Sequence, residues 1–397
     1  MAGDASQAGK GLGTLAVHAG EGETLAVPST TTPVYLATTY RFPDAAEAEA
    51  YLSAPEGRWL YARLENPTVV AAERKIAALE GAEAAACFAS GMAALTAATL
   101  SALRAGDALL VSDTIYGQTT RLALDVLARF GVEIRVVPLA DLAAAAEGAP
   151  ARARALLFET PTNPTLRVVD VEAVAAACRR RGILSMLDAT FASPVNLRAL
   201  PLGVDLVIHS TTKYLNGHSD HLGGAVAGSR ALLDGVVAMR RTTGGNLDAG
   251  AAYELIRGMK TLEVRVLRQN DTALRLARAL EGHPRVERVM YPFLPSHPDH
   301  DRARRLLRGG GGVLSFTVRG GFPAVARVHD ALRIVARASS LGGVESLASI
   351  PVISSHRAAT DAELSAQGID RGTLRVSVGL EDPEDLVADL VQALERA

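Results

Sequence analysis

The chain has 397 residues, of which 48% are hydrophobic and 21% charged, so it can bury a large core and wholesale disorder is excluded. The formal net charge of −2 argues against a protein that tracks nucleic-acid phosphates. At roughly 150 residues per domain, this length favours two or three structural units.

Residues 1 to about 14 are small, polar and rich in glycine, which predicts a mobile tail. Residues 27–67 are rich in proline and threonine and lack helical periodicity, so they are predicted to form an extended arm. An arm of this length in an otherwise compact chain favours a role between subunits.

After this arm, helical patterns alternate with short apolar runs. Helices are predicted over 68–79, 91–103, 119–130 and 171–181, and strands over 84–88, 108–112, 133–137, 155–158, 183–187, 206–209 and 225–227. This alternation is typical of α/β proteins with a mainly parallel sheet covered by helices on both faces.

The pattern changes near residue 248. A long helix is predicted over 251–280, followed by strands at 286–290, 313–318 and 374–378 and by a final helix with Asp382 as N-cap and Pro383 at its first position. We therefore expect a tail and arm over 1–66, a large α/β domain over 67–250, and a smaller α+β domain over 251–397.

Cysteine usage and hydropathy bear on the compartment. Cys87 and Cys178 match no disulfide framework or metal-ligand spacing and are expected to be buried thiols. No apolar run reaches the roughly 18 residues of a membrane span, and the N-terminus has no apolar stretch that could serve as a signal peptide. These features predict a cytoplasmic protein with neither membrane nor nucleic acid as a partner.

In open α/β sheets, ligands bind outside the carboxyl ends of the strands. After 84–88, the small residues Ser90, Gly91 and Met92 open a helix, whose free N–H groups and dipole suit an anion. The later strands end near an aromatic ring, an amide, a carboxylate and a lysine flanked by hydroxyl groups: Tyr116, Asn163, Asp188, Ser210, Thr212 and Lys213.

Lysine is rare in this chain, which carries only Lys10, Lys75, Lys213 and Lys260 among 41 Lys+Arg residues. Lys10 lies in the tail, and Lys75 and Lys260 lie on predicted amphipathic helices, where a surface position is expected. Lys213 is different because it follows a buried strand. A lysine, an acid and a phosphate site are what pyridoxal phosphate requires: a Schiff base, a partner for the pyridine nitrogen, and an anion cradle.

Two other features are given simpler interpretations. His218 and His221 are three residues apart, but no third ligand is evident, so no metal is predicted. The run Gly309–Gly312 resembles a phosphate loop but leads into a strand rather than a helix, which predicts a turn.

From about Tyr35 to its end, the sequence resembles the Cys/Met-metabolism family of pyridoxal-phosphate enzymes. The resemblance depends on eight motifs in order: YARLENPT (61–68), FASGMAAL (88–95), SDTIYGQT (112–119), ETPTNP (159–164), DATF (188–191), HSTTKYLNGHSD (209–220), SLGGVESL (340–347) and LRVSVGLED (374–382). It implies a fold-type I transferase fold like that of aspartate aminotransferase, with pyridoxal 5'-phosphate as cofactor.

The resemblance also implies roles for the matching residues. Lys213 would form the Schiff base and move protons, Asp188 would pair with the ring nitrogen, and Tyr116 would stack on the ring. The phosphate would be held by Gly91, Met92, Ser210 and Thr212, with Tyr61 and Arg63 reaching it from a neighbouring subunit. The substrate α-carboxylate would be bound by Arg375 with Asn163 and Ser340, because a planar guanidinium suits a bidentate contact.

Three departures from the family pattern bear on the substrate. Ala189 follows the ring-nitrogen acid where the family usually has asparagine, and Gln118 stands where methionine γ-lyases typically carry cysteine. Ser339 stands where members that handle cystathionine often place glutamate, so no charge would meet a distal ammonium there.

The expected reaction is γ-elimination on a γ-substituted L-amino acid through a vinylglycine-type intermediate. The alternative is γ-replacement on the same intermediate, of the cystathionine γ-synthase or O-acylhomoserine sulfhydrylase type. An aminotransferase and a cofactor-binding scaffold without turnover are further rivals. The family's manner of assembly implies a homotetramer built from dimers with shared active sites.

Overall fold

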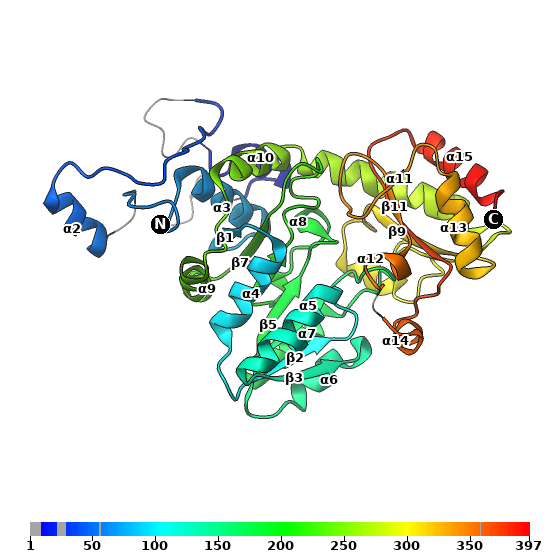
Figure 1. Ribbon diagram of the computed structural model, residues 1–397, viewed down its shortest axis with the longest axis horizontal. Coiled ribbons are helices and arrows are strands. Elements are labelled where there is room, and N and C mark those ends of the chain that lie inside the picture. Colours follow the sequence, from blue (N-terminus) through cyan, green and yellow to red (C-terminus); the bar gives the residue numbers. More distant parts are fainter. Residues whose placement is uncertain (1–8, 22–28, 55–56, 358) are drawn as a thin grey trace.

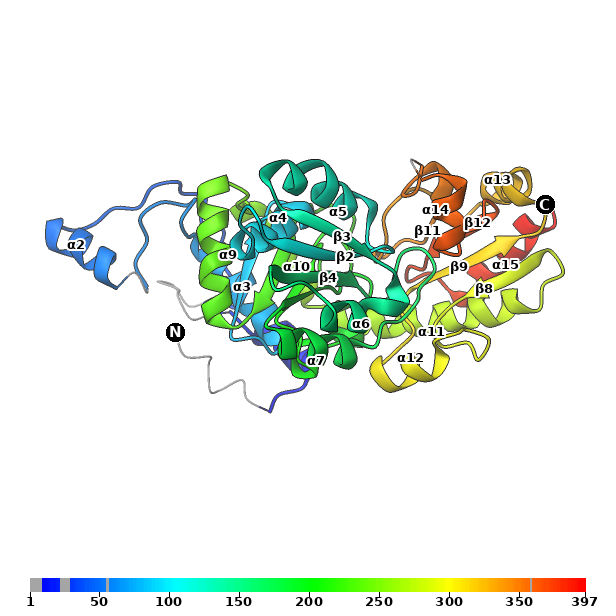
Figure 2. The ribbon, with the colours of Figure 1, turned by 90° about the horizontal axis from the view of Figure 1, so that it is seen from below.

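The computed structural model describes residues 9–21, 29–54, 57–357 and 359–397, so most of the predicted tail lies outside the described residues. Two sheets organise the chain (Figure 1): one of seven strands and one of five. Helix α2 (Ala45–Ser53) stands away from both sheets in two perpendicular views, and the C-terminus lies at the opposite end (Figure 2).

The larger sheet has the order β1-β7-β6-β5-β4-β2-β3. Its strands are β1 (Ala84–Phe88), β2 (Ala108–Ser112), β3 (Glu133–Val137), β4 (Ala153–Glu159), β5 (Leu184–Asp188), β6 (Leu206–His209) and β7 (Gly224–Gly228). Strands β2 to β6 run parallel, whereas β7 is antiparallel to both β6 and β1. The prediction of a mainly parallel sheet is confirmed.

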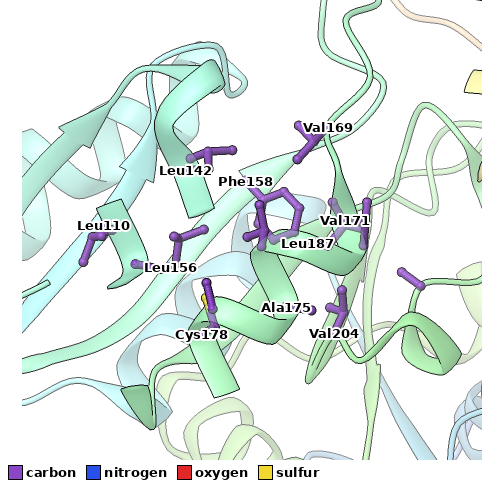
Figure 3. Packing of buried hydrophobic residues seen from close by; sticks show 14 of the residues in the cluster. Leu110, Leu142, Leu156, Phe158, Val169, Val171, Ala175, Cys178, Leu187 and Val204 are labelled. Carbon is purple, nitrogen blue, oxygen red and sulfur yellow. The ribbon is translucent and has the colours of Figure 1, made fainter. Parts of the chain in front are cut away.

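Side chains alternate between the two faces of this sheet, and both faces are covered. Leu109 and Val111 of β2 pack with α4 (Gly91–Ala102) and α9 (Arg230–Thr243), whereas Leu110 packs with α6 (Leu142–Glu147) and α7 (Val171–Arg181). Figure 3 shows the second of these clusters, which includes Cys178. Two-sided burial explains why an inner strand such as β2 is apolar along most of its length, whereas the edge strand β3 carries exposed Arg135 and Val136.

The smaller sheet has the order β10-β11-β12-β9-β8 and is antiparallel except between β10 and β11. Its strands are β8 (Val286–Met290), β9 (Val313–Val318), β10 (Ala336–Arg337), β11 (Leu347–Ser349) and β12 (Thr373–Ser377). Helix α13 (Gly321–Ala331) packs on this sheet and on α15 (Pro383–Leu394). Helix α14 (Asp361–Ala366) precedes β12, whereas α12 (His300–Leu306) places Ala303 in a core cluster of the larger sheet.

The single helix predicted over 251–280 is wrong. The structure has α10 (Ala249–Met259) and α11 (Leu262–Glu281), separated at Lys260 and Thr261. A Cβ at Gly258 would lie 2.2 Å from the carbonyl oxygen of Asn216, so the chain of α10 ends against another loop. The Thr261 hydroxyl also donates to the Gly258 carbonyl, which competes with the helical ladder.

Other helices also differ from the expectations. The segment predicted over 119–130 begins as α5 (Gly117–Arg121), continues as a π-helix (Leu122–Val126) and ends as a 3-10 turn. Helix α1 (Leu12–His18) begins within the segment predicted to be a mobile tail, and α2 lies within the arm predicted to be extended. Asp382 precedes α15 as predicted, but its side chain makes no capping hydrogen bond.

The remaining helices are α3 (Pro67–Glu80) and α8 (Ser193–Asn196). Helix α3 ends at Gly81, whose φ of +70° is the left-handed conformation that favours glycine. Helix α10 packs on α3. Helix α11 contacts α1, which packs beside the larger sheet, and also β8 and β9 of the smaller sheet, so it bridges the two parts of the chain. No described helix has the length and apolar character needed to cross a membrane.

Candidate active site

A cavity of about 420 Å³ lies where the strands of the larger sheet end and the smaller sheet approaches. Most of the predicted site residues line it together: Gly91, Met92, Tyr116, Asn163, Asp188, Ser210, Thr212, Lys213, Ser339, Ser340 and Arg375. They come from segments up to 284 residues apart in sequence (91 to 375). The residues up to Lys213 meet because the carboxyl ends of their strands lie at one edge of the larger sheet, whereas Ser339, Ser340 and Arg375 are brought in by the smaller sheet and its loops.

Lys213 follows β6 and is half-buried in the wall of the cavity. Its Nζ donates a hydrogen bond to the hydroxyl oxygen of Ser340 at 2.7 Å. Burial, followed by the positive charge of Arg375, lowers the pKa of Lys213 to about 8. A substantial fraction of this amine is therefore neutral near physiological pH, the form that attacks a carbonyl carbon.

Asp188 is the last residue of β5 and is buried. Its Oδ1 accepts a hydrogen bond from the Thr190 N–H at 3.0 Å. Burial raises the pKa of Asp188, while hydrogen bonds from Thr190 and the charge of His209 oppose that rise. A cationic group within the cavity would stabilise the ionised form, so the site suits a protonated ring nitrogen.

The predicted phosphate cradle lies at the start of α4. Ser90 caps the helix by accepting from the Ala93 N–H, which leaves the earlier N–H groups of Gly91 and Met92 for an anion. A Cβ at Gly91 would lie 3.1 Å from Cβ of Ser210, so glycine permits the close approach of the two loops. The Thr212 hydroxyl pairs with the main chain of Gly223.

Arg375 projects from β12 and is 6% exposed. Its two terminal nitrogens donate to Oδ1 of Asn163 at 2.8 Å and to the main-chain oxygen of Ser340 at 3.1 Å. Its Nε is buried and has no hydrogen-bond partner among the described residues. Burial lowers the pKa of Arg375 to about 10. A buried fork with a free donor suits a carboxylate ligand.

Tyr116 is 41% exposed and lies at the cavity wall, at the start of α5. An aromatic ring in this position can stack on a planar ligand. Together, the amine, the carboxylate, the helix start and the ring are the donor set that pyridoxal phosphate requires.

Tyr61 and Arg63 do not line this cavity. The guanidinium of Arg63 lies 5.7 Å from the ring centroid of Tyr61 and donates to the main-chain oxygen of Arg241. Tyr61 is 39% exposed on the arm. The prediction that both residues reach the site of a neighbouring subunit stays a prediction.

Sequence reasoning missed several residues of the cavity wall: Glu159, Thr190, Phe191, Leu222, Ser354 and Ser355. Glu159, Thr190 and Phe191 belong to the quoted motifs, so their position after a strand could have identified them. Ser354 and Ser355 lie in a loop of the C-terminal part that carries no signal in the sequence.

The expectation that Lys75 lies at the surface is wrong. Its side chain is completely buried, and its Nζ donates to the main-chain oxygens of Ala16 and Val17 at 2.9 and 3.2 Å. Glu21 lies between Lys75 and Lys260, at 3.6 and 3.1 Å from the two ammonium nitrogens. This lysine therefore ties α1 to α3. The predicted burial of Cys87 and Cys178 is confirmed.

Comparison with known proteins agrees with this chemistry. Residues 13–395 match the family described as "Cys/Met metabolism PLP-dependent enzyme". The chain is 43% identical to cystathionine gamma-synthase 1, chloroplastic, of Arabidopsis thaliana, over 96% of this chain and 69% of that protein. It is 39% identical to an L-methionine gamma-lyase of Fusobacterium nucleatum subsp. polymorphum, over 97% and 98% of the two chains.

A similar solved structure is that of metB from Corynebacterium glutamicum. It superposes with a TM-score of 0.91 at 36% sequence identity, covering 98% of this chain and 99% of that one. The fold class expected from the sequence is thus confirmed.

Proposed function

The chain belongs to the Cys/Met-metabolism family of pyridoxal-phosphate-dependent enzymes, and from this premise we propose that it catalyses γ-elimination on a γ-substituted L-amino acid. The observation that carries the proposal is that Lys213, Asp188 and the Arg375 fork line one cavity. Pyridoxal phosphate, when bound, withdraws electrons from the carbon atoms next to the amino group of the substrate.

Each residue then has a task that its surroundings support. Lys213 holds the cofactor and afterwards removes the protons at Cα and Cβ, a task favoured by its lowered pKa. Asp188 holds the proton of the ring nitrogen, and Tyr116 fixes the plane of the ring. Gly91, Met92, Ser210 and Thr212 bind the phosphate.

The Arg375 fork binds the α-carboxylate, with Asn163 and Ser340 holding the guanidinium in place. This contact orients the substrate so that its Cα proton faces Lys213, whose Nζ contacts the same serine. Recognition and proton transfer thus meet at one residue.

A second candidate reaction is γ-replacement. It is favoured by the 43% identity to a cystathionine gamma-synthase, whereas the methionine gamma-lyase relative favours elimination. The two reactions differ in what captures the substrate after the γ-group has left. Incubation with O-acetylhomoserine and with methionine, with and without added thiol, separates them: 2-oxo acid and ammonia indicate elimination, and a new thioether amino acid indicates replacement.

The wall of the cavity supports a γ-group without a distal amine. Ser339, Ser354 and Ser355 contribute neutral hydroxyl groups. The carboxylates of the wall are Glu159 and Asp188, and both already accept main-chain hydrogen bonds. The distal ammonium of cystathionine would find no free carboxylate among these wall residues and would lack a charge-assisted hydrogen bond worth about 1.5–3 kcal/mol. Its kcat/KM should therefore be roughly 10- to 100-fold lower than that of a substrate without a distal amine.

Substitution at Ser339 tests this selectivity. Ser339→Glu should shift the ratio of kcat/KM values for cystathionine and O-acetylhomoserine toward cystathionine, whereas the uncharged Ser339→Gln should not. A wild-type preference for cystathionine would contradict the assignment.

We also propose that the active site is shared between subunits of a homotetramer built from dimers. Tyr61 and Arg63 lie outside the cavity of their own chain, and the same arm exposes 80% of Leu36. Mixing inactive Arg63→Ala and Lys213→Ala proteins under subunit exchange should restore activity, because one site of a mixed dimer has both residues. Exchange without recovery would contradict sharing.

Two further expectations remain proposals. The division of the chain at residues 66 and 250 is testable by limited proteolysis. A cytoplasmic location is testable by fractionation, and it contrasts with the chloroplastic description of the Arabidopsis relative.

A further inference from the structure

Glu159 is a buried acid in the cavity wall that the reaction described above does not use. It is the last residue of β4 and only 2% of it is exposed. In the parallel register of β4 and β5 it stands opposite Asp188. Burial and then the charge of Asp188 raise the pKa of Glu159 well above its usual value, against the effect of two main-chain hydrogen bonds and Arg375.

Both carboxyl oxygens of Glu159 accept main-chain hydrogen bonds, one from the loop after β2 and one from the loop after β4. Oε2 accepts from the N–H of Tyr116 at 3.0 Å, and Oε1 accepts from the N–H of Asn163 at 2.9 Å. Tyr116 follows β2, the neighbour of β4 on one side, whereas Asn163 lies in the loop after β4 itself. One carboxyl group therefore ties two loops together at the edge of the sheet.

The two loops carry residues with different tasks. The ring of Tyr116 lies at the cavity, where it can face the cofactor. The amide of Asn163 accepts from Arg375 at 2.8 Å and so holds the carboxylate clamp. An acid buried at this depth is costly unless its contacts compensate, and an apolar residue in its place would leave the N–H groups of Tyr116 and Asn163 without their acceptor.

We propose that Glu159 is a positioning residue that fixes the Tyr116 ring and the Asn163 amide relative to each other, and thereby sets both cofactor seating and α-carboxylate binding. The inference rests on the proposed function for the second of these tasks only. Glu159 itself exchanges no proton with the substrate.

Glu159→Gln is the test, because glutamine keeps the size of the side chain but replaces one acceptor with a donor that faces a main-chain N–H. The matched control is Asp389→Asn. Asp389 is 4% exposed and accepts hydrogen bonds from the main-chain N–H groups of Arg333, Ile334 and Val335, and it does not line the cavity. Asp389→Asn therefore also replaces a buried carboxylate acceptor with an amide, but away from the site.

We expect Glu159→Gln to raise the dissociation constant of pyridoxal phosphate about tenfold and KM for the amino acid by a similar factor. The visible circular dichroism of the bound cofactor, which reports the seating of the ring, should fall. Asp389→Asn should lower the melting temperature and leave cofactor affinity, dichroism and KM unchanged.

Double variants identify the route of the effect. In an Asn163→Ala background, Glu159→Gln should raise KM much less, and in a Tyr116→Ala background it should change cofactor affinity much less. If Glu159→Gln does not fold, Glu159→Asp replaces it: aspartate keeps the acid but is too short to reach both N–H groups, so the same shifts are expected.

Cofactor affinity, dichroism and KM within about twofold of wild type in Glu159→Gln would overturn the proposal, since even one net hydrogen bond is worth more than that. Equal effects of Glu159→Gln and Asp389→Asn would also overturn it, because they would mean a loss of stability alone. Cofactor affinity and dichroism do not depend on which reaction occurs. A wild-type enzyme without elimination products would therefore refute the proposed function and leave this test intact.

Discussion

Lys213, which is half-buried, and Lys75, which is completely buried, have the same lowered pKa of about 8 but different surroundings. Lys75 is surrounded by acceptors, namely the main-chain oxygens of Ala16 and Val17 and the carboxylate of Glu21. Lys213 donates to the Ser340 hydroxyl and lines the cavity of the candidate active site. The difference teaches that burial and a shifted pKa do not by themselves make a lysine reactive; access to a carbonyl compound does.

The largest expected effect comes from removing the accessible lysine. Lys213→Ala should lower kcat by at least about a thousandfold, because no other group can supply both the Schiff base and the proton transfer. Borohydride reduction of the wild-type holoenzyme should fix the pyridoxyl group on Lys213, as read by peptide mass. A pyridoxyl group found on Lys75 or Lys260 would contradict the assignment of Lys213 as the lysine that carries the cofactor.

Removing the enclosed lysine should affect stability instead. Lys75→Met leaves the main-chain oxygens of Ala16 and Val17 without their donor and leaves Glu21 with Lys260 as its only ammonium partner among those described, so the free energy of unfolding should fall by about 3 kcal/mol. Denaturant unfolding measures the loss, and kcat should be unchanged. The exposed Lys10 offers the control, since Lys10→Met should change stability by less than about 0.5 kcal/mol. Equal stability of the Lys75 variant and the wild type would refute the role of Lys75.

The contact of Lys213 with Ser340 predicts a smaller effect on rate. Hydrogen bonds to charged groups contribute about 1.5–3 kcal/mol, so Ser340→Ala should lower kcat about 10- to 100-fold. Ser340 has a φ of +111°, a conformation that favours glycine. Ser340→Gly should therefore be more stable than Ser340→Ala but equally impaired; a normal rate in the glycine variant would show that the hydroxyl group is not needed.

The smallest expected effect is a pH dependence that separates the two amines. Because the pKa of Lys213 is lowered to about 8, its neutral fraction rises about tenfold between pH 7 and 9. In the apoprotein, acylation of Lys213 by an amine-reactive reagent should accelerate accordingly and level off above pH 9. Lys75 has the same pKa but should be labelled only after unfolding. Labelling of Lys75 in the folded apoprotein would contradict its enclosure.

Elements determined by local signals were predictable from the sequence. The runs at 84–88, 108–112, 133–137, 206–209, 286–290 and 313–318 form strands with those bounds. Most are apolar along their length, whereas 133–137 and 286–290 combine apolar with charged residues, and all lie between turn signals. The convergence of Lys213 and Asp188 followed from their positions after predicted strands, and that of Arg375 from the motif resemblance.

Features that depend on distant contacts were not predictable. The break after α10 arises where Gly258 packs against Asn216, some forty residues earlier in the chain. Lys75 lies on a helix of ordinary amphipathic pattern, and its burial depends on α1, which the sequence did not indicate. Glu159 was visible in its motif, but its partners are main-chain N–H groups, which no side-chain pattern reveals.

Ser340 joins two tasks through its two oxygens: its main-chain oxygen accepts from Arg375, and its hydroxyl accepts from Lys213. A carboxylate that draws the guanidinium toward itself therefore also pulls on the residue that aligns the amine. An amine without a carboxylate cannot move the guanidinium of Arg375 in this way. Its kcat should therefore be low even at saturating concentration, when weak affinity no longer limits the rate. Under the proposed function, discrimination at Ser340 should therefore act on turnover as well as on binding.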